Sequence, residues 1–287
     1  MNRPKVSVIT TAYNYARYLP HLWESLQYQV YGNFEWIVVD DASTDETFAY
    51  MMHVVEEVDS QRYASAQCLD EPHTYRDVQT VKSIVRGVHY VRLTKNHGYG
   101  HAKNVGIQAA TGEYFVMIDA DDVLTPYSLT VRVAALQEHP DKLWVHGDAL
   151  NLSLEGQIQE RYIEWIRNKR KQLEAEGWDL TKQYHHRLIH AQTVMMRREF
   201  YERFGLYDES LRFSGDNEMW RRAIRFGCIP IHLEKAVAIY RVHNQRMSRS
   251  EYKRKRVAAA KEYIKRIVEI RYKEGISSAN TPMLEAR

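Results

Sequence analysis

Three carboxylates stand within four positions of this 287-residue sequence, at Asp119, Asp121 and Asp122, directly after an apolar run. Carboxylates this close repel one another unless a cation lies between them. Their hard oxygen atoms suit Mg²⁺ or Mn²⁺, with phosphate oxygens completing the coordination shell. A solvated turn with a helix cap before Pro126 is the alternative interpretation, because short acidic runs are common by chance.

A second acidic run, from Asp40 to Asp45, ends another apolar segment. In other nucleotide-binding folds an acid at such a position accepts hydrogen bonds from a nucleobase N–H or from ribose hydroxyls. Ser43 or Thr44 is expected to cap the following helix, which explains Ser43 and Asp45 without a ligand. Asp41 is harder to explain in this way, because two adjacent acids at the end of a strand are costly unless a ligand is bound.

Glycines and a basic residue mark the segment Asn96–Gly106. Glycine lets the backbone approach a ligand closely, and the start of the following helix favours anions. Lys103 and Asn104 are then expected to reach a diphosphate or a sugar. The segment is not a Walker loop, because no Gly-Lys-Ser/Thr follows it, and no dinucleotide fingerprint follows the first strand.

Two later segments offer a candidate base and further cations. Asp216 follows Ser-Gly at a predicted helix start, which suits a general base with Trp220 anchoring the helix, although a plain helix cap is the alternative. Arg241 and His243 follow a predicted strand and offer a guanidinium and an imidazole to phosphate or metal. A single histidine is more often structural than a ligand.

The elements that position these residues alternate between strands and helices in the first half of the chain. The predicted strands are Val6–Thr11, Glu35–Asp40, Val88–Leu93 and Glu113–Ile118, and the predicted helices are Tyr18–Gln29, 43–58 and His101–Ala110. This alternation predicts an α/β fold with a mostly parallel sheet, in which ligands bind beyond the carboxyl ends of the strands. Residues 59–88 are expected to form an irregular insertion.

The alternation of strands and helices is less regular beyond residue 140. Further predicted strands are Leu143–Leu152, His190–Met196 and Ala236–Tyr240, and further predicted helices are Glu160–Glu176, Arg198–Phe204, Met219–Phe226 and the long basic Ser250–Lys273. Apolar residues recur in the last helix at Val257, Ile264, Ile267 and Val268. This amphipathic pattern fits either packing against the domain or docking on an anionic membrane.

The amino-acid composition excludes several classes of protein. With 44% hydrophobic and 27% charged residues, the chain is expected to be globular rather than disordered or fibrous. Two cysteines, Cys68 and Cys228, make neither a disulfide framework nor a zinc site, which favours a cytoplasmic location. No run approaches the roughly 18 apolar residues of a membrane span, and no signal peptide is expected. From Arg241 onwards, 13 Lys and Arg stand against 5 Glu, which indicates an anionic partner surface or a solvated helix face.

Six motifs in order make the sequence resemble the GT-A glycosyltransferases of family 2, inverting enzymes that use nucleotide-diphosphate sugars and a divalent metal. The motifs are VSVITTAYNYARYL, WIVVDDASTD, NHGYGHAKNVGI, GEYFVMIDADD, SGDNEMW and YRVHNQRMS. The resemblance implies a Rossmann-like GT-A domain over residues 1–248, with a nucleotide-sugar-binding part over about 1–125 and an acceptor-binding part over about 126–248. Residues 249–287 would form a basic C-terminal helix and tail.

The resemblance also implies roles for individual residues. The expected nucleotide-sugar-binding residues are Thr11, Ala12, Tyr13, Asn14, Asp41, Lys103, Asn104, Asp119, Ala120, Asp121 and Arg241. Within this set, Thr11, Tyr13 and Asp41 would hold the base, often uracil, with Asp119 near the ribose. Asp121 and His243 would ligate Mn²⁺ or Mg²⁺, and Asp216 matches the general base. Two positions depart from the usual pattern, because Lys103 replaces an arginine and Gly215 replaces a glutamate.

The expected activity is transfer of a sugar, with a UDP-sugar as the favoured donor, to a hydroxyl of a glycan or lipid-linked glycan. Aromatic and histidine side chains that suit sugar stacking, or that belong to the core, are Tyr162, Trp165, Trp178, Tyr184, His185 and His186. Peripheral contact with a membrane through the basic helix and a nucleic-acid acceptor with modified bases stay open, as does the oligomeric state. A nucleotidyltransferase would need a glycine-rich basic loop after the first strand. A non-catalytic sugar-nucleotide-binding module would lack Asp121 or Asp216, which are both present.

Overall fold

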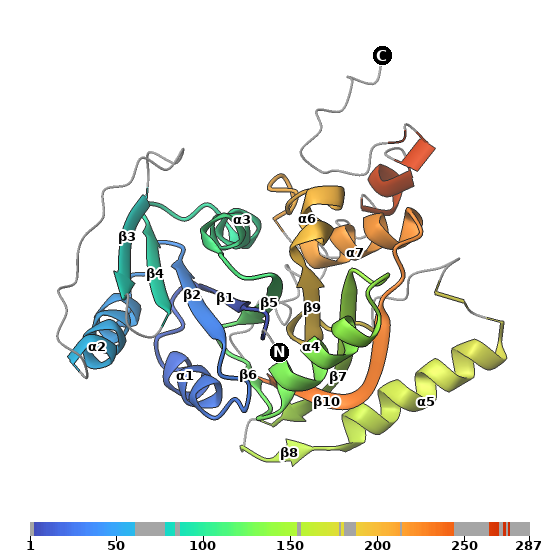
Figure 1. Ribbon diagram of the computed structural model, residues 1–287, viewed down its shortest axis with the longest axis horizontal. Helices are drawn as coiled ribbons and strands as arrows, with labels where there is room; N and C mark the ends of the chain where they lie inside the picture. Colours follow the sequence, from blue (N-terminus) through green and yellow to red (C-terminus); the bar gives the residue numbers. More distant parts are fainter. Residues whose placement is uncertain are drawn as a thin grey trace. The chain divides into compact units, whose positions relative to one another are not determined.

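The computed structural model describes residues 3–60, 78–83, 87–153, 156–177, 179–180, 188–212, 214–243, 264–269, 272–273 and 275. The chain divides into two compact units, Met1–Val131 and Arg132–Arg287. Figure 1 shows the helices and strands of both units.

The first unit contains a parallel sheet with one antiparallel edge strand. Its strand order is β3-β4-β2-β1-β5, and neighbouring strands are parallel except for β3 and β4. The strands are β1 (Val6–Ala12), β2 (Phe34–Asp40), β3 (Val78–Ser83), β4 (Val88–Leu93) and β5 (Tyr114–Asp119), and the helices are α1 (Leu19–Gln27), α2 (Thr47–Ser60) and α3 (Tyr99–Ala109). The α/β class and the mostly parallel sheet expected from the sequence are therefore confirmed.

Helices cover both faces of this sheet (Figure 1). Successive side chains of a strand point to opposite faces. Ile9 and Val39 face α3, because Gly106 of α3 packs against both side chains. Trp36 lies on the opposite face, where Trp23 of α1 stacks on it with ring centroids 5.1 Å apart. Glycine is required at position 106, since a Cβ there would overlap with Cγ2 of Ile9, and this close approach fixes α3 on the sheet.

The second unit is built around β7 (Trp144–Leu152). The strands β8 (Ile158–Gln159) and β9 (Val194–Arg197) pair with β7 in antiparallel register, and β10 (Ile231–Arg241) pairs with it in parallel. Its helices are α5 (Arg161–Ala175), η1 (Ala191–Thr193), α6 (Arg198–Phe204) and α7 (Gly215–Arg225), and β6 (Val123–Leu124) and α4 (Ser128–Glu138) follow β5 along the chain. Trp220 of α7 stacks on Trp144 with ring centroids 6.4 Å apart, so it anchors the helix as expected.

Part of the expected irregular insertion is a strand. β3 pairs with β4 in antiparallel register, from Val78 opposite Leu93 to Ser83 opposite Val88. The sequence pattern missed β3 because its residues show no clean alternation, and its conformation depends on the partner strand. Residues 61–77 and 84–86, with Cys68 among them, lie outside the described part of the chain.

Helix α2 begins later than the sequence pattern predicted. Its first residue is Thr47, and the Oδ1 atom of Asp45 accepts hydrogen bonds from the Thr47 backbone N–H at 3.1 Å and from its hydroxyl at 2.6 Å. Asp45 is therefore the capping side chain, and the expectation for Ser43 or Thr44 was wrong. Both of those residues take part in a loop network described below.

Two elements of the second unit also differ from the ranges that the sequence pattern predicted. Helix α7 begins at Gly215, which agrees with the helix start predicted at Asp216, whereas the apolar periodicity alone predicted a start at Met219 because the first turn is polar. The predicted strand His190–Met196 begins only at Val194. The preceding residues form η1, where the Thr193 hydroxyl donates to the His190 carbonyl at 2.7 Å.

The described part of the C-terminal region packs on the second unit. Ile264, Ile267 and Val268 form a buried cluster with Leu211, and Arg225 pairs with Glu269 at 2.9 Å. These apolar side chains are therefore covered by protein, which agrees with the expectation that this helix packs against the domain. The basic run at residues 253–256 and the aromatic and histidine residues at 178 and 184–186 lie outside the described residues. Among the helices that the structure does describe, none has the length and apolar character of a membrane span.

Candidate functional site

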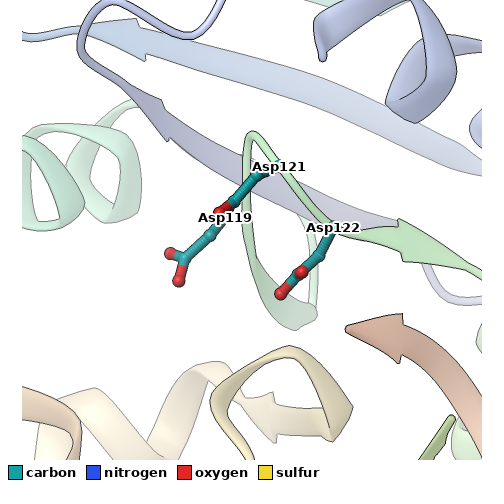
Figure 2. Close-up of side chains that lie close together, drawn as sticks. All are labelled: Asp119, Asp121 and Asp122. Atoms are coloured by element: carbon teal, nitrogen blue, oxygen red, sulfur yellow. The ribbon is translucent and has the colours of Figure 1, made fainter. Parts of the chain in front are cut away.

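Three carboxyl groups meet where β5 ends. Asp119, Asp121 and Asp122 each offer an oxygen atom within 4.8 Å of the others. Figure 2 shows the three groups on the same side of the turn, which a backbone hydrogen bond from Asp122 N–H to the Asp119 carbonyl closes at 3.1 Å. The Asp119 side chain is 53% exposed, whereas Asp122 is buried. The cluster is therefore open to solvent on the Asp119 side.

The position of this cluster in the sheet is that of a ligand site. The chain runs from β1 to β2 on one side, while β5 lies on the other side of β1, so the strand order reverses between β1 and β5. Ligands of open parallel sheets bind beyond the carboxyl ends of the strands at such a reversal. Thr11 is paired in register with Asp119, and Ala12, Tyr13 and Asn14 follow it at the same edge.

Oxygen atoms alone make up the ligand set of the acidic cluster. Such a set fits a hard divalent cation such as Mg²⁺ or Mn²⁺. Asp119, Asp121 and Asp122 are the residues that would hold it, and the buried Asp122 was not among the predicted site residues although it belongs to the predicted acidic run. Ala120 between them is buried and contributes no side-chain ligand.

Lys103 supplies a cation next to this cluster. It lies on α3 one turn before Gly106, and its ammonium is 4.0 Å from Oδ1 of Asp119 and 5.1 Å from the centre of the Tyr99 ring. The Lys103 side chain is only 3% exposed, and the neighbouring Asn104 is also buried. The packing of α3 on β1 therefore holds a buried positive charge beside the exposed carboxylate.

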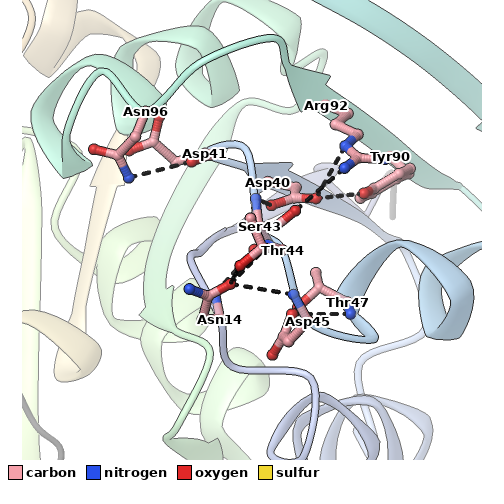
Figure 3. A network of polar contacts seen from close by, with 10 residues as sticks. All are labelled: Asn14, Asp40, Asp41, Ser43, Thr44, Asp45, Thr47, Tyr90, Arg92 and Asn96. Carbon is pink, nitrogen blue, oxygen red and sulfur yellow. Dashed lines mark hydrogen bonds and ion pairs between the residues drawn. The ribbon is translucent and has the colours of Figure 1, made fainter.

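The Asn14 side chain joins the loops after β1 and β2 (Figure 3). Its Oδ1 atom accepts hydrogen bonds from the backbone N–H groups of Thr44 and Asp45 at 2.8 and 3.3 Å. In return, the Asn14 backbone N–H donates to the hydroxyl of Ser43 at 2.9 Å. Asn14 has a φ of 59°, a left-handed conformation that asparagine tolerates well. The side chain predicted to bind nucleotide thus also fixes the shape of the loop.

Asp41 holds the segment that leads into α3. Its two carboxylate oxygens accept hydrogen bonds from the backbone N–H groups of His97 and Gly98, at 2.7 and 2.8 Å. Asn96 Nδ2 donates to the Asp41 carbonyl at 3.2 Å (Figure 3). The argument that adjacent acids at this strand end need a ligand was wrong, because backbone donors already compensate the Asp41 carboxylate. Its expected contact with the base stays a prediction.

Asp40 has a separate set of donors. The hydroxyl of Tyr90 donates to it at 2.7 Å, and the backbone N–H of Ser43 does so at 2.8 Å. Arg92 lies 3.7 Å away (Figure 3). Burial and this hydrogen bond raise the pKa of Tyr90 well above its ordinary value. Asp40 is therefore a structural acid.

Tyr13, by contrast, is 46% exposed at the end of β1, and its ring is available for stacking.

Asp216 lies in the second unit, in the first turn of α7, and it is partly exposed. The hydroxyl of Tyr207 donates to its Oδ1 atom at 3.0 Å. Ser214, just before the helix, has a φ of 64°, so the chain turns through a left-handed residue into the helix that carries Asp216. The N-terminal end of a helix favours a negative charge, which suits a carboxylate that works in its ionised form.

The remaining predicted residues lie at the end of β10. Arg241 is its last residue, and the buried His243 follows two positions later. Both belong to the second unit, whereas the three clustered aspartates belong to the first. Their expected roles at the metal and the diphosphate stay predictions, and residues 244–250 lie outside the described part.

Sequence reasoning missed three structural features of the candidate site. These are the hydrogen bond from Tyr207 to Asp216, the joining role of Asn14 and the third clustered carboxylate, Asp122. Asp122 had a signal, since it continues the acidic run. The other two depend on contacts between separate segments, for which a single sequence carries no local pattern.

The fold resembles those of solved proteins that bind a nucleotide or a nucleotide sugar. TarS of S. aureus, crystallised with UDP, matches with a TM-score of 0.60 and 18% identity over 93% of this chain and 64% of that chain. A mannosyltransferase of Pyrobaculum calidifontis in complex with GDP-Man and Mn²⁺ matches with a TM-score of 0.61 and 21% identity, over 92% of this chain and 70% of that one. The structure thus falls in the class of α/β proteins with the fold of these two enzymes.

Sequence comparison gives the family. The profile of "Glycosyl transferase family 2" matches residues 7–59 and 68–222. An uncharacterised glycosyltransferase of Haemophilus influenzae is 26% identical over 251 residues, which is 86% of this chain and 68% of that protein. The chain belongs to glycosyl transferase family 2, as its motifs predicted. It spans about two thirds of the H. influenzae and S. aureus chains.

Proposed function

We propose that this chain transfers a sugar from a nucleotide-diphosphate donor to an acceptor hydroxyl, by a single displacement that inverts the anomeric configuration. The observation that carries the proposal is the cluster of Asp119, Asp121 and Asp122 at the reversal of strand order, with Lys103 beside it. Membership of family 2 gives the reaction class to which this chemistry belongs.

The first unit would bind the donor. Tyr13 offers an exposed ring to the base, while Thr11 and Asp41 offer a hydroxyl and a carboxylate at the same edge. The other residues of the proposed nucleotide-sugar site would be Ala12, Asn14, Lys103, Asn104 and Ala120, and Arg241 would add a cation for the diphosphate. A UDP-sugar is the favoured donor. TarS was solved with UDP and the P. calidifontis enzyme with GDP-Man, so both bases occur among proteins of this fold.

Asp119, Asp121 and Asp122 would hold Mn²⁺ or Mg²⁺, with His243 as the further predicted ligand. The bound metal would supply positive charge against the diphosphate as it leaves. The P. calidifontis neighbour was solved with Mn²⁺. Lys103, 4.0 Å from Asp119, would orient that carboxylate and add to the positive charge at the leaving group.

Asp216 would act as the general base. Its carboxylate takes the proton of the acceptor hydroxyl while the oxygen attacks the anomeric carbon. The bond between that carbon and the diphosphate oxygen breaks in the same step, and its electron pair leaves with the nucleoside diphosphate. One displacement of this kind inverts the anomeric centre. The partly exposed position of Asp216 in the first turn of α7 suits this role.

The proposed acceptor is a glycan or a lipid-linked glycan. On α5, Tyr162 and Trp165 stack with ring centroids 6.1 Å apart, and Trp165 is 43% exposed. The Tyr162 hydroxyl is also hydrogen-bonded to Nε2 of His190 at 2.9 Å. An exposed aromatic face beside hydrogen-bonding side chains suits the apolar face and the hydroxyls of a sugar ring.

A thermal-shift panel tests the donor and metal assignment. UDP-, GDP-, TDP- and CMP-sugars are each measured with and without Mn²⁺. A donor at 100 times its Kd stabilises the protein by about 2.7 kcal/mol. We expect a Mn²⁺-dependent shift with one nucleotide class, which is lost in Asp121→Asn and kept in Asp141→Asn, a matched change at a 71% exposed carboxylate. A panel with no shift for any donor would overturn the assignment.

A second measurement tests transfer itself. The donor that shifts the melting temperature is incubated with glycan and lipid-linked glycan acceptors, and proton NMR records the anomeric configuration of the first product. Inversion supports the single displacement, and retention contradicts it. Transfer only to DNA with modified bases, or release of pyrophosphate in place of a nucleoside diphosphate, would favour the competing interpretations.

A further inference from the structure

A buried tyrosine contacts the proposed general base. Tyr207 lies between α6 and α7 and is 1% exposed. Its hydroxyl donates to Oδ1 of Asp216 at 3.0 Å. A donor within hydrogen-bond distance of a carboxylate limits rotation of that carboxylate and stabilises its ionised form. A partly exposed base thus has a buried partner on its protein side.

The segment that carries Tyr207 is itself fixed. Arg222 of α7 is completely buried and pairs with Glu218 at 2.8 Å. The same guanidinium donates to the carbonyls of Phe204 and of Leu206, the residue directly before Tyr207. Because both partners of this ion pair are buried, the contact is costly to break. The position of the Tyr207 hydroxyl relative to α7 is therefore set by α7 itself.

A second phenol lies near the same carboxylate. Tyr201 of α6 is buried, and its pKa is raised well above the ordinary value, first by burial and then by the charge of Asp216. Asp216 therefore has the phenols of Tyr201 and Tyr207 among its neighbours. A phenol with a raised pKa keeps its proton at neutral pH, so no second negative charge arises beside the base.

We propose that Tyr207 is a positioning residue for the general base Asp216. By holding Oδ1 it sets the direction in which the carboxylate presents its second oxygen to the acceptor hydroxyl. The inference rests on the proposed function for the role of Asp216, but the contact itself is testable without any substrate.

The first experiment uses the full chain with ¹³C-labelled aspartate side chains. The signal of Asp216 is assigned by its loss in Asp216→Asn, and the chemical shift of its carboxyl carbon at pH 7 is compared between wild type and Tyr207→Phe. Loss of the hydrogen bond should move this resonance by more than it moves the other aspartate signals. An unchanged resonance would overturn the proposal, whatever the enzyme does.

The control is Tyr31→Phe, which removes another buried hydroxyl, one that donates to the Pro4 carbonyl in the first unit. It should leave the Asp216 resonance unchanged. A second variant keeps the test valid if Tyr207→Phe does not fold. Site-specific 3-fluorotyrosine at position 207 keeps the ring and makes its hydroxyl a stronger donor, so the Asp216 resonance should move in the opposite direction.

Turnover then separates this inference from the proposed function. With the donor found by thermal shift, nucleotide release is measured from pH 5 to 9. Tyr207→Phe should lower kcat about tenfold and leave the donor KM unchanged at every pH. If Asp216→Asn retains wild-type turnover while the NMR shift is present, the contact exists but Asp216 is not the base, and the positioning role fails with it.

Discussion

The two acidic segments at the edge of the first sheet differ in what surrounds their carboxylates. After β2, Asp40 and Asp41 accept hydrogen bonds from Tyr90, from Ser43 and from the backbone of residues 97 and 98. After β5, three carboxyl groups face one another within 4.8 Å, with Lys103 as the neighbouring cation. An acid at a sheet edge therefore does not by itself indicate a ligand. What distinguishes the two segments is that the carboxylates after β5 lie together, whereas those after β2 accept hydrogen bonds from separate sets of donors.

The largest expected effect is at Asp216, the carboxylate proposed to act as the general base. Asp216→Asn should reduce turnover by about 10²–10⁴-fold while the donor Kd stays close to wild type. The melting temperature should change little, because the amide can still accept from Tyr207. Nucleotide release and the thermal shift with donor measure both effects. Near-normal turnover would remove Asp216 from the mechanism.

Glu35 extends the comparison to the amino ends of the strands. It is the second residue of β2, it is buried, and its carboxylate is held by hydrogen bonds within the protein. Burial raises its pKa, but hydrogen bonds from Lys5, Ser7 and Thr111 outweigh burial and lower the pKa from 4.5 to about 2. A carboxyl group whose pKa is lower in the folded than in the unfolded protein stabilises the fold at pH values above its unfolded-state pKa. That stability, about 3 kcal/mol, should be lost as the pH falls from about 4.5 to 2.

Urea unfolding between pH 7 and pH 2 measures this loss. Glu35→Gln should be less stable at neutral pH and should lack this contribution to the acid dependence, whereas Glu138→Gln, at an exposed helix end, should behave as wild type. If Glu35→Gln keeps the full acid dependence, its hydrogen bonds are not the source.

Asp41→Asn tests the first half of the comparison directly. The amide retains one acceptor oxygen, but its NH₂ group faces a backbone N–H of residue 97 or 98. We expect a loss of about 2 kcal/mol in the free energy of unfolding, measured without any ligand. Asp141→Asn is again the matched control. An unchanged stability would mean that these two hydrogen bonds do not hold the loop.

The smallest effect is expected at the acidic cluster. Asp121→Asn removes one of three neighbouring carboxylates, so the metal-free protein should keep its stability or gain up to about 0.5 kcal/mol. Chemical unfolding in the presence of a chelator measures this difference. A loss comparable to that of Asp41→Asn would end the distinction between the two segments.

The sequence predicted the central strands and the acidic edge well, because both have local signals. Buried β-branched runs mark β1, β2, β4 and β5, and the acids follow them directly. It failed where conformation depends on a distant partner. β3 depends on pairing with β4. Tyr207 lies nine residues before Asp216 in a loop, and no periodicity connects the two.

The Asn14 side chain has a consequence for protein engineering. Because its amide oxygen accepts from the backbone of Thr44 and Asp45, the loops after β1 and β2 form a single exchangeable module. A graft that imports one loop from a relative, with another residue at position 14, would leave these two N–H groups without their acceptor. Chimeras intended to change donor preference should therefore move both loops together, and libraries that randomise one loop should hold position 14 constant.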